Sequence, residues 1–560
     1  MARTALFSRL RRLAAIASRA PLDADRNPGR ELGRRELLAG AAASALTLTC
    51  AARAEDPGET NTPESPRVAV IGAGLAGLCC AYWLEKAGVD VVVREASSRI
   101  GGRTLTARGR LPDGLRCELG GEFIDSVHAA MRTLAIELEI ALDDLHVYDD
   151  VRDEVYWVGG RLVAEGLLLT QLSRVLPAIV RALEAADVDR RELDATPLSV
   201  WLRANLVNEP QLQAVLTTAY RGEFGLETDQ QSALNLIYLI GFDTENLRPI
   251  GDSDQRYRAR DGNDVFAERL AAELDDRLET DQRLIAVRRA GDGFTLTFEN
   301  QRRTGSRLAA ARVVFALPFS VLRHVDLDGA GLSEAKRDVI ATLGYGTNTK
   351  LVGAFATRSW RDQRMSGSVT SDLPFQQVWD SSTGQNGDRG ALTHLLGGDA
   401  GLDASAGTAE ERLTAMLGHL NQVFPNVGST YLENSALRLH WPSMPFARGS
   451  YSCCRYGQWA IAELAGEPEG ALYFCGEHCS VDFRASMEGA VETGALTAAR
   501  VLDDLGVERP DALNELLAVK TAVPQPCYDR APAAPLGVLT RRRRVLAAHA
   551  AFARALEPSA

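Results

Sequence analysis

The sequence predicts an α+β fold in which a doubly wound dinucleotide-binding domain is interleaved with a domain of mixed sheet and helices. A glycine-rich turn near residue 72 separates two β-branched segments, long amphipathic segments follow residue 125, and helix-then-strand alternation returns beyond residue 258. A chain of 560 residues is also too long for one ordinary core, so at least two domains are expected.

The composition is that of a globular, acidic protein. Hydrophobic residues make up 46% and charged residues 24%, and no apolar run is long enough to span a bilayer, so no stable membrane span is expected. The net charge of -12 argues against a nucleic-acid partner, because phosphate backbones require a basic face. The nine cysteines are poorly spaced for a disulfide framework.

The N-terminal segment 1–54 is predicted to be an export signal. Arg34 and Arg35 precede a weakly polar apolar stretch of about 14 residues, too short for a permanent transmembrane helix. The segment resembles a twin-arginine signal that is cleaved after Ala54, which implies the twin-arginine export machinery as a partner and a periplasmic or secreted protein. An arginine-rich disordered N-terminus is the alternative.

A complete βαβ unit is predicted after this leader. Residues 67–71 form a buried parallel strand, and Gly72, Gly74 and Gly77 form the GxGxxG pattern of a Rossmann-like turn before a helix. The second strand ends on Glu95, which can accept hydrogen bonds from the ribose of a dinucleotide, while the pyrophosphate lies at the helix N-terminus.

Two further glycine pairs favour a flavin dinucleotide over a nicotinamide one. Gly101 and Gly102 precede Arg103, so that the chain can pass close to a large ligand and neutralise its pyrophosphate. In "CELGGEFID", Gly120 and Gly121 again permit a close approach of the backbone.

Near the other end of the chain, "LYFCGEHCSVDFRASMEGAVETG" predicts a strand that runs into Gly476-Glu477. A helix begins at the MEGAVE segment, and its N-terminus can face flavin oxygens.

Together these segments resemble the flavin-containing amine oxidase family, which includes monoamine, polyamine and L-amino-acid oxidases. The resemblance rests on E-x3-R-x-GGR, ELGG and GEH…MEGAVE and covers about residues 66–505. It implies FAD, held by Gly72, Gly74, Gly77, Glu95, Arg99, Gly101, Gly102, Arg103, Gly120, Gly121, Leu284, Gly476, Glu477, Met487 and Glu488. No metal is expected, because Cys475 and Cys479 become neighbours of the FAD-contacting pair.

The resemblance also implies how the domains divide the chain. The FAD-binding domain is expected from residues 66–140, 256–330 and 445–505, the substrate-binding domain from 141–255 and 331–444, and a C-terminal extension from 506–560.

Two residues are assigned to the chemistry by the same resemblance. Lys350 stands at the lysine that holds a water against flavin N5, where a positive charge favours electron transfer to oxygen. Tyr451 matches the first of two aromatic rings that flank the substrate nitrogen and favour its free-base form. Ser450 occupies the position where some relatives carry a cysteine bonded to the flavin, so non-covalent FAD is expected.

The expected substrate pocket departs from the usual pattern. Trp441 packs near the first ring, but the second ring position falls on Ser486, so Phe483 is a candidate to fill that space. Glu122 and Phe123 stand where an amino-acid oxidase often has an arginine for the substrate carboxylate, and an acid there suits a second amine. Arg221 could still bind a carboxylate from elsewhere.

The leading hypothesis is therefore an oxidase that converts an amine, O2 and water to a carbonyl compound, ammonia or a smaller amine, and H2O2. An L-amino-acid oxidase with the same flavin step is the alternative. A carotenoid-type FAD desaturase and a non-enzymatic FAD-binding protein remain open, as does the choice between a monomer and a homodimer.

Overall fold

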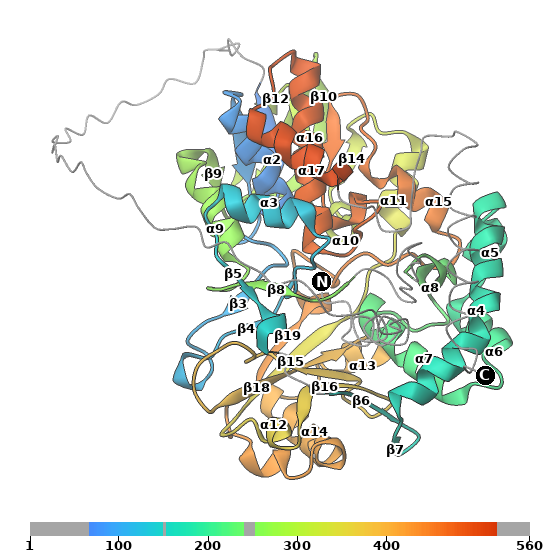
Figure 1. Cartoon of the computed structure of the whole chain (residues 1–560). Coiled ribbons are helices and arrows are strands. Elements are labelled where there is room, and N and C mark those ends of the chain that lie inside the picture. The colour runs from blue at the N-terminus through green and yellow to red at the C-terminus, as the bar shows by residue number, and fades with distance from the viewer. Residues whose placement is uncertain (1–66, 149–152, 240–252, 523–560) are drawn as a thin grey trace, which may run out of the picture.

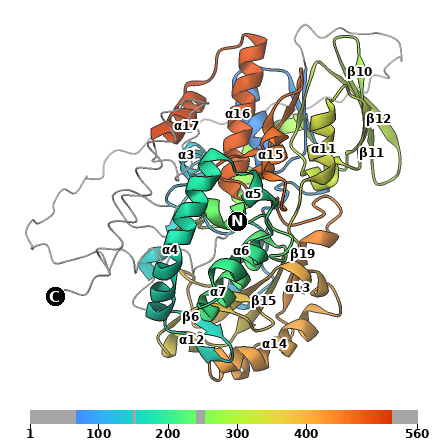
Figure 2. The same cartoon turned by 90° about the vertical axis from the view of Figure 1, so that its right-hand side faces the viewer.

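A computed structural model of the protein describes residues 67–148, 153–239 and 253–522 (Figure 1). The predicted export signal and the C-terminal extension beyond residue 522 lie outside the described residues. Two lobes are visible in Figures 1 and 2, one around a parallel sheet and the other around a large mixed sheet. We call them the parallel-sheet lobe and the mixed-sheet lobe.

The parallel-sheet lobe is centred on β1 (Val68–Ile71), whose four side chains are all buried. β1 lies within a five-stranded sheet of order β20-β13-β1-β2-β9, in which every pairing is parallel. The other strands are β2 (Val91–Arg94), β9 (Leu278–Glu279), β13 (Arg312–Phe315) and β20 (Leu472–Phe474). Because these strands come from distant stretches of chain, the predicted doubly wound, interleaved fold is confirmed, while the exact domain boundaries stay a prediction.

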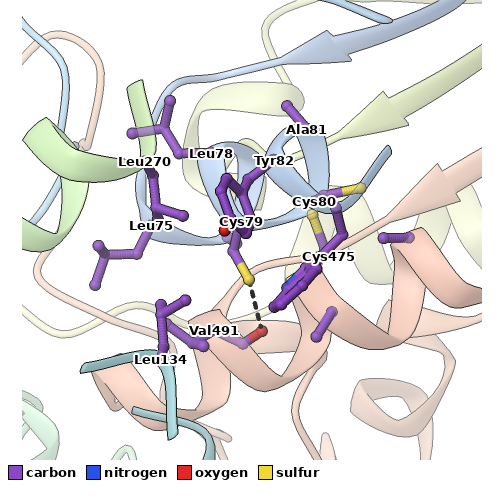
Figure 3. Close-up of a cluster of buried hydrophobic side chains, with 14 of the residues drawn as sticks. Leu75, Leu78, Cys79, Cys80, Ala81, Tyr82, Leu134, Leu270, Cys475 and Val491 are labelled. Carbon is purple, nitrogen blue, oxygen red and sulfur yellow. Dashed lines mark hydrogen bonds between the residues drawn. The ribbon is translucent and has the colours of Figure 1, made fainter. Parts of the chain in front are cut away.

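Helices α2 (Leu75–Lys86) and α16 (Met487–Leu505) pack together in the core of this lobe (Figure 3). The thiol of Cys79 donates to the carbonyl oxygen of Val491 at 3.5 Å, across more than four hundred residues of sequence. A Cβ at Gly77 would lie 1.9 Å from the carbonyl oxygen of Gly72. The third glycine of the GxGxxG pattern therefore allows α2 to start directly against the turn.

Smaller elements complete the parallel-sheet lobe. A four-stranded sheet has the order β12-β11-β10-β14. Its strands are β10 (Arg283–Ala290), β11 (Gly293–Glu299), β12 (Gly305–Ala310) and β14 (Asp326–Gly329). Its further helices are α9 (Val265–Ala272), α10 (Phe319–Leu322), α11 (Glu334–Thr342), α15 (Trp459–Ala462) and α17 (Asp511–Ala522). A short hairpin of β3 (Thr106–Ala107) and β4 (Cys117–Glu118) instead packs on the other lobe, where Ala107 and Cys117 share a core with Val352 and Ala354.

One helix is shorter than the sequence predicts. The amphipathic segment 131–142 favours a helix throughout, but α3 (Ala129–Glu137) ends early and Glu139 has a φ of 52°. The chain then forms β5 (Leu142–Asp144), which pairs with β8 (Tyr257–Ala259). The spacing of apolar residues continues unchanged from α3 through β5. The local sequence therefore does not show where the helix ends, and only the pairing with the distant strand β8 does.

The mixed-sheet lobe contains a seven-stranded sheet of order β19-β15-β18-β17-β16-β6-β7. Its strands are β6 (Asp153–Val158), β7 (Arg161–Leu162), β15 (Thr349–Phe355), β16 (Met365–Ser371), β17 (Gln377–Asp380), β18 (Gly390–Leu396) and β19 (Leu437–His440). Every residue of β15 and β18 is buried. Helices α12 (Ser359–Asp362), α13 (Gly398–Asp403) and α14 (Ala409–Val423) belong to the same lobe.

A helical cluster flanks this sheet (Figures 1 and 2) and consists of α4 (Glu165–Val188), α5 (Arg191–Ala195), α6 (Leu198–Asn205), α7 (Pro210–Phe224) and α8 (Leu234–Leu239). By length and composition α4 could cross a membrane, which corrects the prediction that no apolar run is long enough. Half of its most apolar window is buried against neighbours such as α7 and α8. Core helices pass the same test, so α4 is weak evidence for a span.

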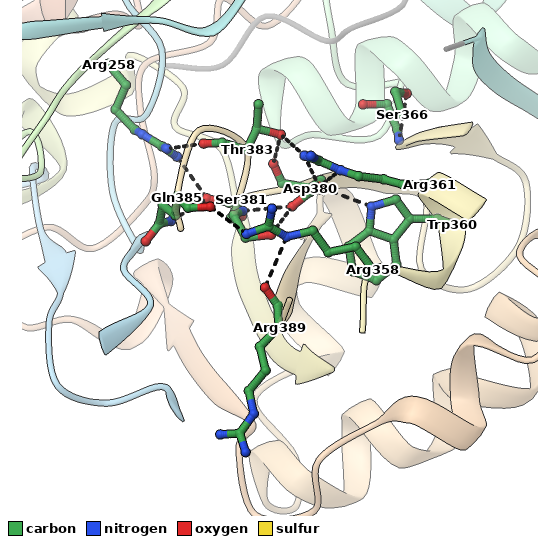
Figure 4. A network of polar contacts seen from close by, with 12 residues as sticks. Arg258, Arg358, Trp360, Arg361, Ser366, Asp380, Ser381, Thr383, Gln385 and Arg389 are labelled. Carbon is green, nitrogen blue, oxygen red and sulfur yellow. Dashed lines mark hydrogen bonds and ion pairs between the residues drawn. The ribbon is translucent and has the colours of Figure 1, made fainter. Parts of the chain in front are cut away.

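A polar network ties the end of β17 to both lobes (Figure 4). The carboxylate of Asp380 accepts hydrogen bonds from Trp360 Nε1 at 3.1 Å and from Arg361 Nη2 at 2.7 Å. Arg258, next to the core residue Ala259 of the parallel-sheet lobe, donates to the carbonyl oxygen of Ser381 at 2.9 Å. The buried guanidinium of Arg258 therefore links the two lobes.

Candidate active site

A cavity of about 510 Å³ lies where the two lobes meet. Most of the predicted site residues line it, namely Gly72, Gly74, Glu95, Arg99, Gly101, Gly102, Arg103, Gly120, Gly121, Leu284, Lys350, Trp441, Tyr451, Gly476, Glu477, Ser486 and Met487. The lining does not include Gly77, Glu122, Phe123, Phe483 or Glu488. The fold therefore brings together residues that are separated by more than four hundred positions in the chain.

The glycine turn after β1 forms one wall. Gly72 has a φ of +106°, and a Cβ there would lie 2.9 Å from the carbonyl oxygen of Ala316. α2 then begins after Gly74 with no side-chain cap and no acidic residue in its first turn. The N–H groups at its start are therefore open to an anion such as a pyrophosphate.

Glu95 is held at the edge of the cavity by the backbone. Its Oε2 accepts a hydrogen bond from Ala73 N at 2.7 Å and its Oε1 accepts one from Ser97 N at 2.8 Å. Burial raises the pKa of this carboxyl group. Each carboxylate oxygen retains a second lone pair, so Glu95 can still accept from ribose hydroxyl groups.

Arg103 and Glu477 form an ion pair that joins three chain segments. Arg103 Nη1 donates to Glu477 Oε1 at 2.7 Å and to the carbonyl oxygen of Ser450 at 3.0 Å. Glu477 also accepts hydrogen bonds from Ser452 Oγ at 2.7 Å and from Ala485 N at 2.9 Å. Burial alone would raise the pKa of Glu477, but the charge of Arg103 and the hydrogen bonds from Ser452 and Arg103 lower it to about 2.

The CGEHC segment has no metal-binding geometry. His478 is fully buried, its ring packs 4.4 Å from that of Phe319, and burial lowers its pKa to about 3. Burial also raises the pKa values of Cys475 and Cys479. Within residues 67–148, 153–239 and 253–522, no group of three or more His, Cys, Asp or Glu side chains could hold a metal ion.

Glu488, predicted to contact FAD, lies outside the cavity lining. Its two carboxylate oxygens accept hydrogen bonds from Ala130 N at 2.8 Å and Met131 N at 2.7 Å. A carboxylate at a helix N-terminus satisfies N–H groups that otherwise lack partners. Glu488 therefore holds the start of α3, and Met487 alone of this pair reaches the cavity.

The two phenylalanines predicted for the substrate pocket are buried outside the lining. Phe123 packs against Trp379, with 6.0 Å between ring centroids, and Phe483 packs edge-on against His128 at 5.6 Å. Phe483 therefore does not supply the second aromatic ring. Ser486 does line the cavity, and its Oγ caps α16 by accepting from Gly489 N at 3.1 Å.

Lys350 lines the cavity from β15, the second strand of the mixed sheet, where it pairs with Leu395 of β18. Its Nζ donates to the carbonyl oxygens of Glu118 and Gly120, both at 2.9 Å, and to Glu122 Oε2 at 2.6 Å. Glu122 is thus bound to Lys350 behind the cavity wall. The structure differs here from the prediction of a substrate-facing acid.

Tyr451 and Trp441 supply the aromatic part of the lining. The Tyr451 hydroxyl donates to the carbonyl oxygen of Gly222 at 3.2 Å, and burial, with the charge of Glu223, keeps its pKa well above the usual value. Trp441 Nε1 donates to the carbonyl oxygen of Leu119 at 3.2 Å. Both polar atoms are thereby bound to the backbone.

Ser450 and Arg221 are also placed by neighbouring side chains. Ser450 Oγ donates to Asn348 Oδ1 at 2.6 Å and lies in the cavity lining, with no thiol at this position. Arg221 Nε donates to Glu227 Oε2 at 2.8 Å, and Arg221 does not line the cavity. Its predicted role as a carboxylate-binding residue has no support in this geometry.

Some lining residues were not predicted. Asn348 and Leu395 lie beside Lys350, and the segment 444–448 and His324 line another part of the cavity. Asn348 precedes Lys350 by two positions on the same strand-like run, so the alternation of a β-strand would have indicated it. Leu395 belongs to the neighbouring strand, and no local signal marks it.

Comparison with known proteins identifies the family. The family model for flavin containing amine oxidoreductases matches residues 75–502. The chain belongs to this family. Two similar proteins are the putative flavin-containing monoamine oxidase AofH of Mycobacterium tuberculosis, 27% identical over 79% of this chain and 98% of its own, and an L-amino-acid oxidase of Siganus canaliculatus, 26% identical over 83% and 93%.

Solved structures of two amine-oxidising enzymes share the fold. Cyclohexylamine oxidase from Brevibacterium oxydans superposes with a TM-score of 0.69 at 21% identity, covering 79% of this chain and 100% of that one. Putrescine oxidase bound to putrescine gives 0.66 at 22% identity, covering 78% and 99%. Membership of the family makes the protein a flavin-dependent oxidoreductase with a flavin cofactor.

Proposed function

We propose that the protein is an FAD-dependent amine oxidase that oxidises a C–N bond to an imine and reduces O2 to H2O2. Water then hydrolyses the imine to a carbonyl compound and ammonia or a smaller amine. The carbon loses a hydride, the nitrogen loses a proton, and O2 takes up both as H2O2. The observation that carries the proposal is a single cavity that joins the glycine turn of a dinucleotide site to Lys350, Trp441 and Tyr451.

The residues along this cavity fit FAD. Gly72, Gly74 and the uncapped start of α2 would hold the pyrophosphate, and Glu95 the adenosine ribose. Leu284 would pack near the adenine, and the start of α16 would face the flavin. Bound FAD would supply the acceptor for the hydride.

The binding of FAD is proposed to be non-covalent. Ser450 stands where some relatives carry a cysteine bonded to the flavin, and its hydroxyl is engaged by Asn348. Denaturation with acid should therefore release all of the flavin into the supernatant. Flavin that remained with the precipitated protein would contradict this part of the proposal.

The aromatic residues prepare the substrate. Tyr451 and Trp441 direct their polar atoms to backbone carbonyl groups, so their rings offer the cavity an apolar surface. An apolar surface disfavours the ammonium form of a bound amine, and only the neutral amine carries the lone pair needed for oxidation. The two electrons of the C–H bond can then leave the carbon as a hydride.

The test uses the purified protein with its flavin and panels of amines and L-amino acids. We expect amines to bleach the visible flavin absorbance without air and to produce H2O2 in air. Turnover with amino acids alone would select the L-amino-acid oxidase, and dehydrogenation of a carotenoid precursor would select the desaturase. A flavin that no amine or amino acid reduces would favour a non-enzymatic role.

We also propose export by the twin-arginine machinery to the periplasm or the medium. Arg34 and Arg35 support this proposal, because the signal depends on both arginines. Replacing both with lysine should leave the flavoprotein inside the cell, as measured by fractionation and flavin absorbance. Unchanged export of the variant would contradict it.

A further inference from the structure

Glu122 is held by contacts on both of its carboxylate oxygens. Oε2 accepts from Lys350 Nζ at 2.6 Å, and Oε1 accepts from Trp379 Nε1 at 2.9 Å. The side chains of Glu122 and Lys350 are only 1% and 7% exposed. Such a buried, doubly bound carboxylate has one fixed orientation, directed at the lysine.

The ammonium group of Lys350 has no N–H left for another acceptor. A lysine ammonium carries three donors, and the carbonyl oxygens of Glu118 and Gly120 together with Glu122 Oε2 take all three. The Nζ atom also lies 5.2 Å from the centre of the Trp379 ring, within the range of a cation–π contact. Lys350 would have to break one of these bonds before it could hold a water.

The pairing also changes the charge that the cavity experiences. An isolated buried ammonium would act strongly on a neighbouring group in a medium of low dielectric constant, whereas a close ion pair acts mainly as a dipole. Lys350 lines the cavity and Glu122 lies directly behind it.

We propose that Glu122 is a positioning residue that clamps Lys350 onto the 118–120 turn and offsets its charge beside the flavin site. Glu122 acts through the charge of Lys350, without contact with the cavity, and Trp379 only holds its other carboxylate oxygen. The inference rests on the proposed binding of FAD, and it is independent of which substrate the enzyme oxidises.

The test measures the reduction equilibrium of the bound flavin in four proteins: the wild type, Glu122→Gln, Lys350→Met and the double variant. Each is titrated anaerobically with a chemical reductant beside a reference dye. Glu122→Gln leaves an unopposed cation and should favour the reduced flavin about tenfold, or about 30 mV for two electrons. Lys350→Met should shift the equilibrium the other way, and the neutral double variant should return to within about twofold of wild type.

Trp379→Phe is the matched control, because it removes the second hydrogen bond to Glu122 without changing any charge. Its equilibrium should stay within about twofold of wild type. The inference is overturned if the double variant keeps the full shift of Lys350→Met, since Glu122 would then not act through the lysine. An equilibrium in Glu122→Gln equal to that of wild type would overturn it as well.

Thermal unfolding of the same proteins separates this inference from the proposed function. Each single variant leaves a buried charge without its partner, so the double variant should melt at a higher temperature than either single variant. A double variant that melts below both would overturn the clamp. If the wild type failed to take up FAD, the proposed function would be contradicted. The melting temperatures of the single and double variants would still test the ion pair.

Discussion

The two sides of the cavity are built from different parts of the polypeptide. On the side of the parallel-sheet lobe the backbone forms the wall, with the Gly72 turn and the uncapped start of α2. On the side of the mixed-sheet lobe the wall includes the side chains of Lys350 and Leu395. A dinucleotide can be held by the backbone N–H groups that every residue except proline carries, whereas oxidation requires particular side chains. Binding and chemistry should therefore respond to different substitutions.

The largest effect is expected on the backbone side. In Gly77→Ala the new Cβ would lie 1.9 Å from the carbonyl oxygen of Gly72, so the turn and the start of α2 must move apart. We expect a loss of about 3 kcal/mol of stability and of nearly all bound flavin, measured by denaturant unfolding and by absorbance. Gly418→Ala in α14, where a Cβ has no neighbour within 4 Å, is the control and should keep its flavin. Full flavin content in Gly77→Ala would remove the distinction between the two sides.

On the side of the mixed-sheet lobe, Lys350→Met should keep its bound flavin but react more slowly with O2. The substitution leaves the buried Glu122 carboxylate unpaired next to the cavity, which opposes the transfer of negative charge to oxygen. Reoxidation of the reduced enzyme by O2 in a stopped-flow instrument should slow about 100-fold. An unchanged oxidative rate with full flavin content would exclude Lys350 from the reaction with oxygen.

A smaller effect is expected at the aromatic wall. Tyr451→Leu removes the ring from the cavity and should lower kcat/KM for the best amine about tenfold, equivalent to about 1.4 kcal/mol. Tyr451→Phe is the matched control, because it removes only the hydrogen bond to the Gly222 carbonyl and should stay within about threefold. If both variants lost activity equally, the hydroxyl and not the ring would be the important group.

The two lobes should contribute similarly to the loss of stability in acid, through one buried histidine each. His478 in the parallel-sheet lobe and His394 in β18 are fully buried, and burial lowers the pKa of each to about 3. Between about pH 6.5 and 3 the unfolded chain binds protons that the folded protein excludes, so the free energy of unfolding falls as the pH drops. Each histidine contributes about 1.4 kcal/mol per pH unit at most, measured by denaturant unfolding between pH 6 and 4. His394→Gln and His478→Gln should each reduce that slope, and a flat wild-type profile would show that both rings are charged in the fold.

The backbone features of this protein could be predicted from its sequence, whereas many side-chain contacts could not. Glycine turns and apolar strands are recognisable from the local sequence, so the βαβ unit and the interleaved fold were predicted. The orientation of a side chain depends on partners that are distant in the sequence. The sequence therefore did not reveal that Glu488 binds the start of α3 or that Phe483 packs on His128. Neither contact leaves a pattern in the surrounding sequence.

The amino-acid sequence by itself determined the family, the glycine-rich cradle and the flavin chemistry, because these depend on short motifs whose backbone requirements are local. Only the tertiary structure decided that Lys350 meets Glu122 across 228 positions, and that the Arg103–Glu477 ion pair joins the glycine loop to the segment before α16. A buried charge must find a partner wherever the fold places one. The choice of that partner is consequently a property of the packed molecule.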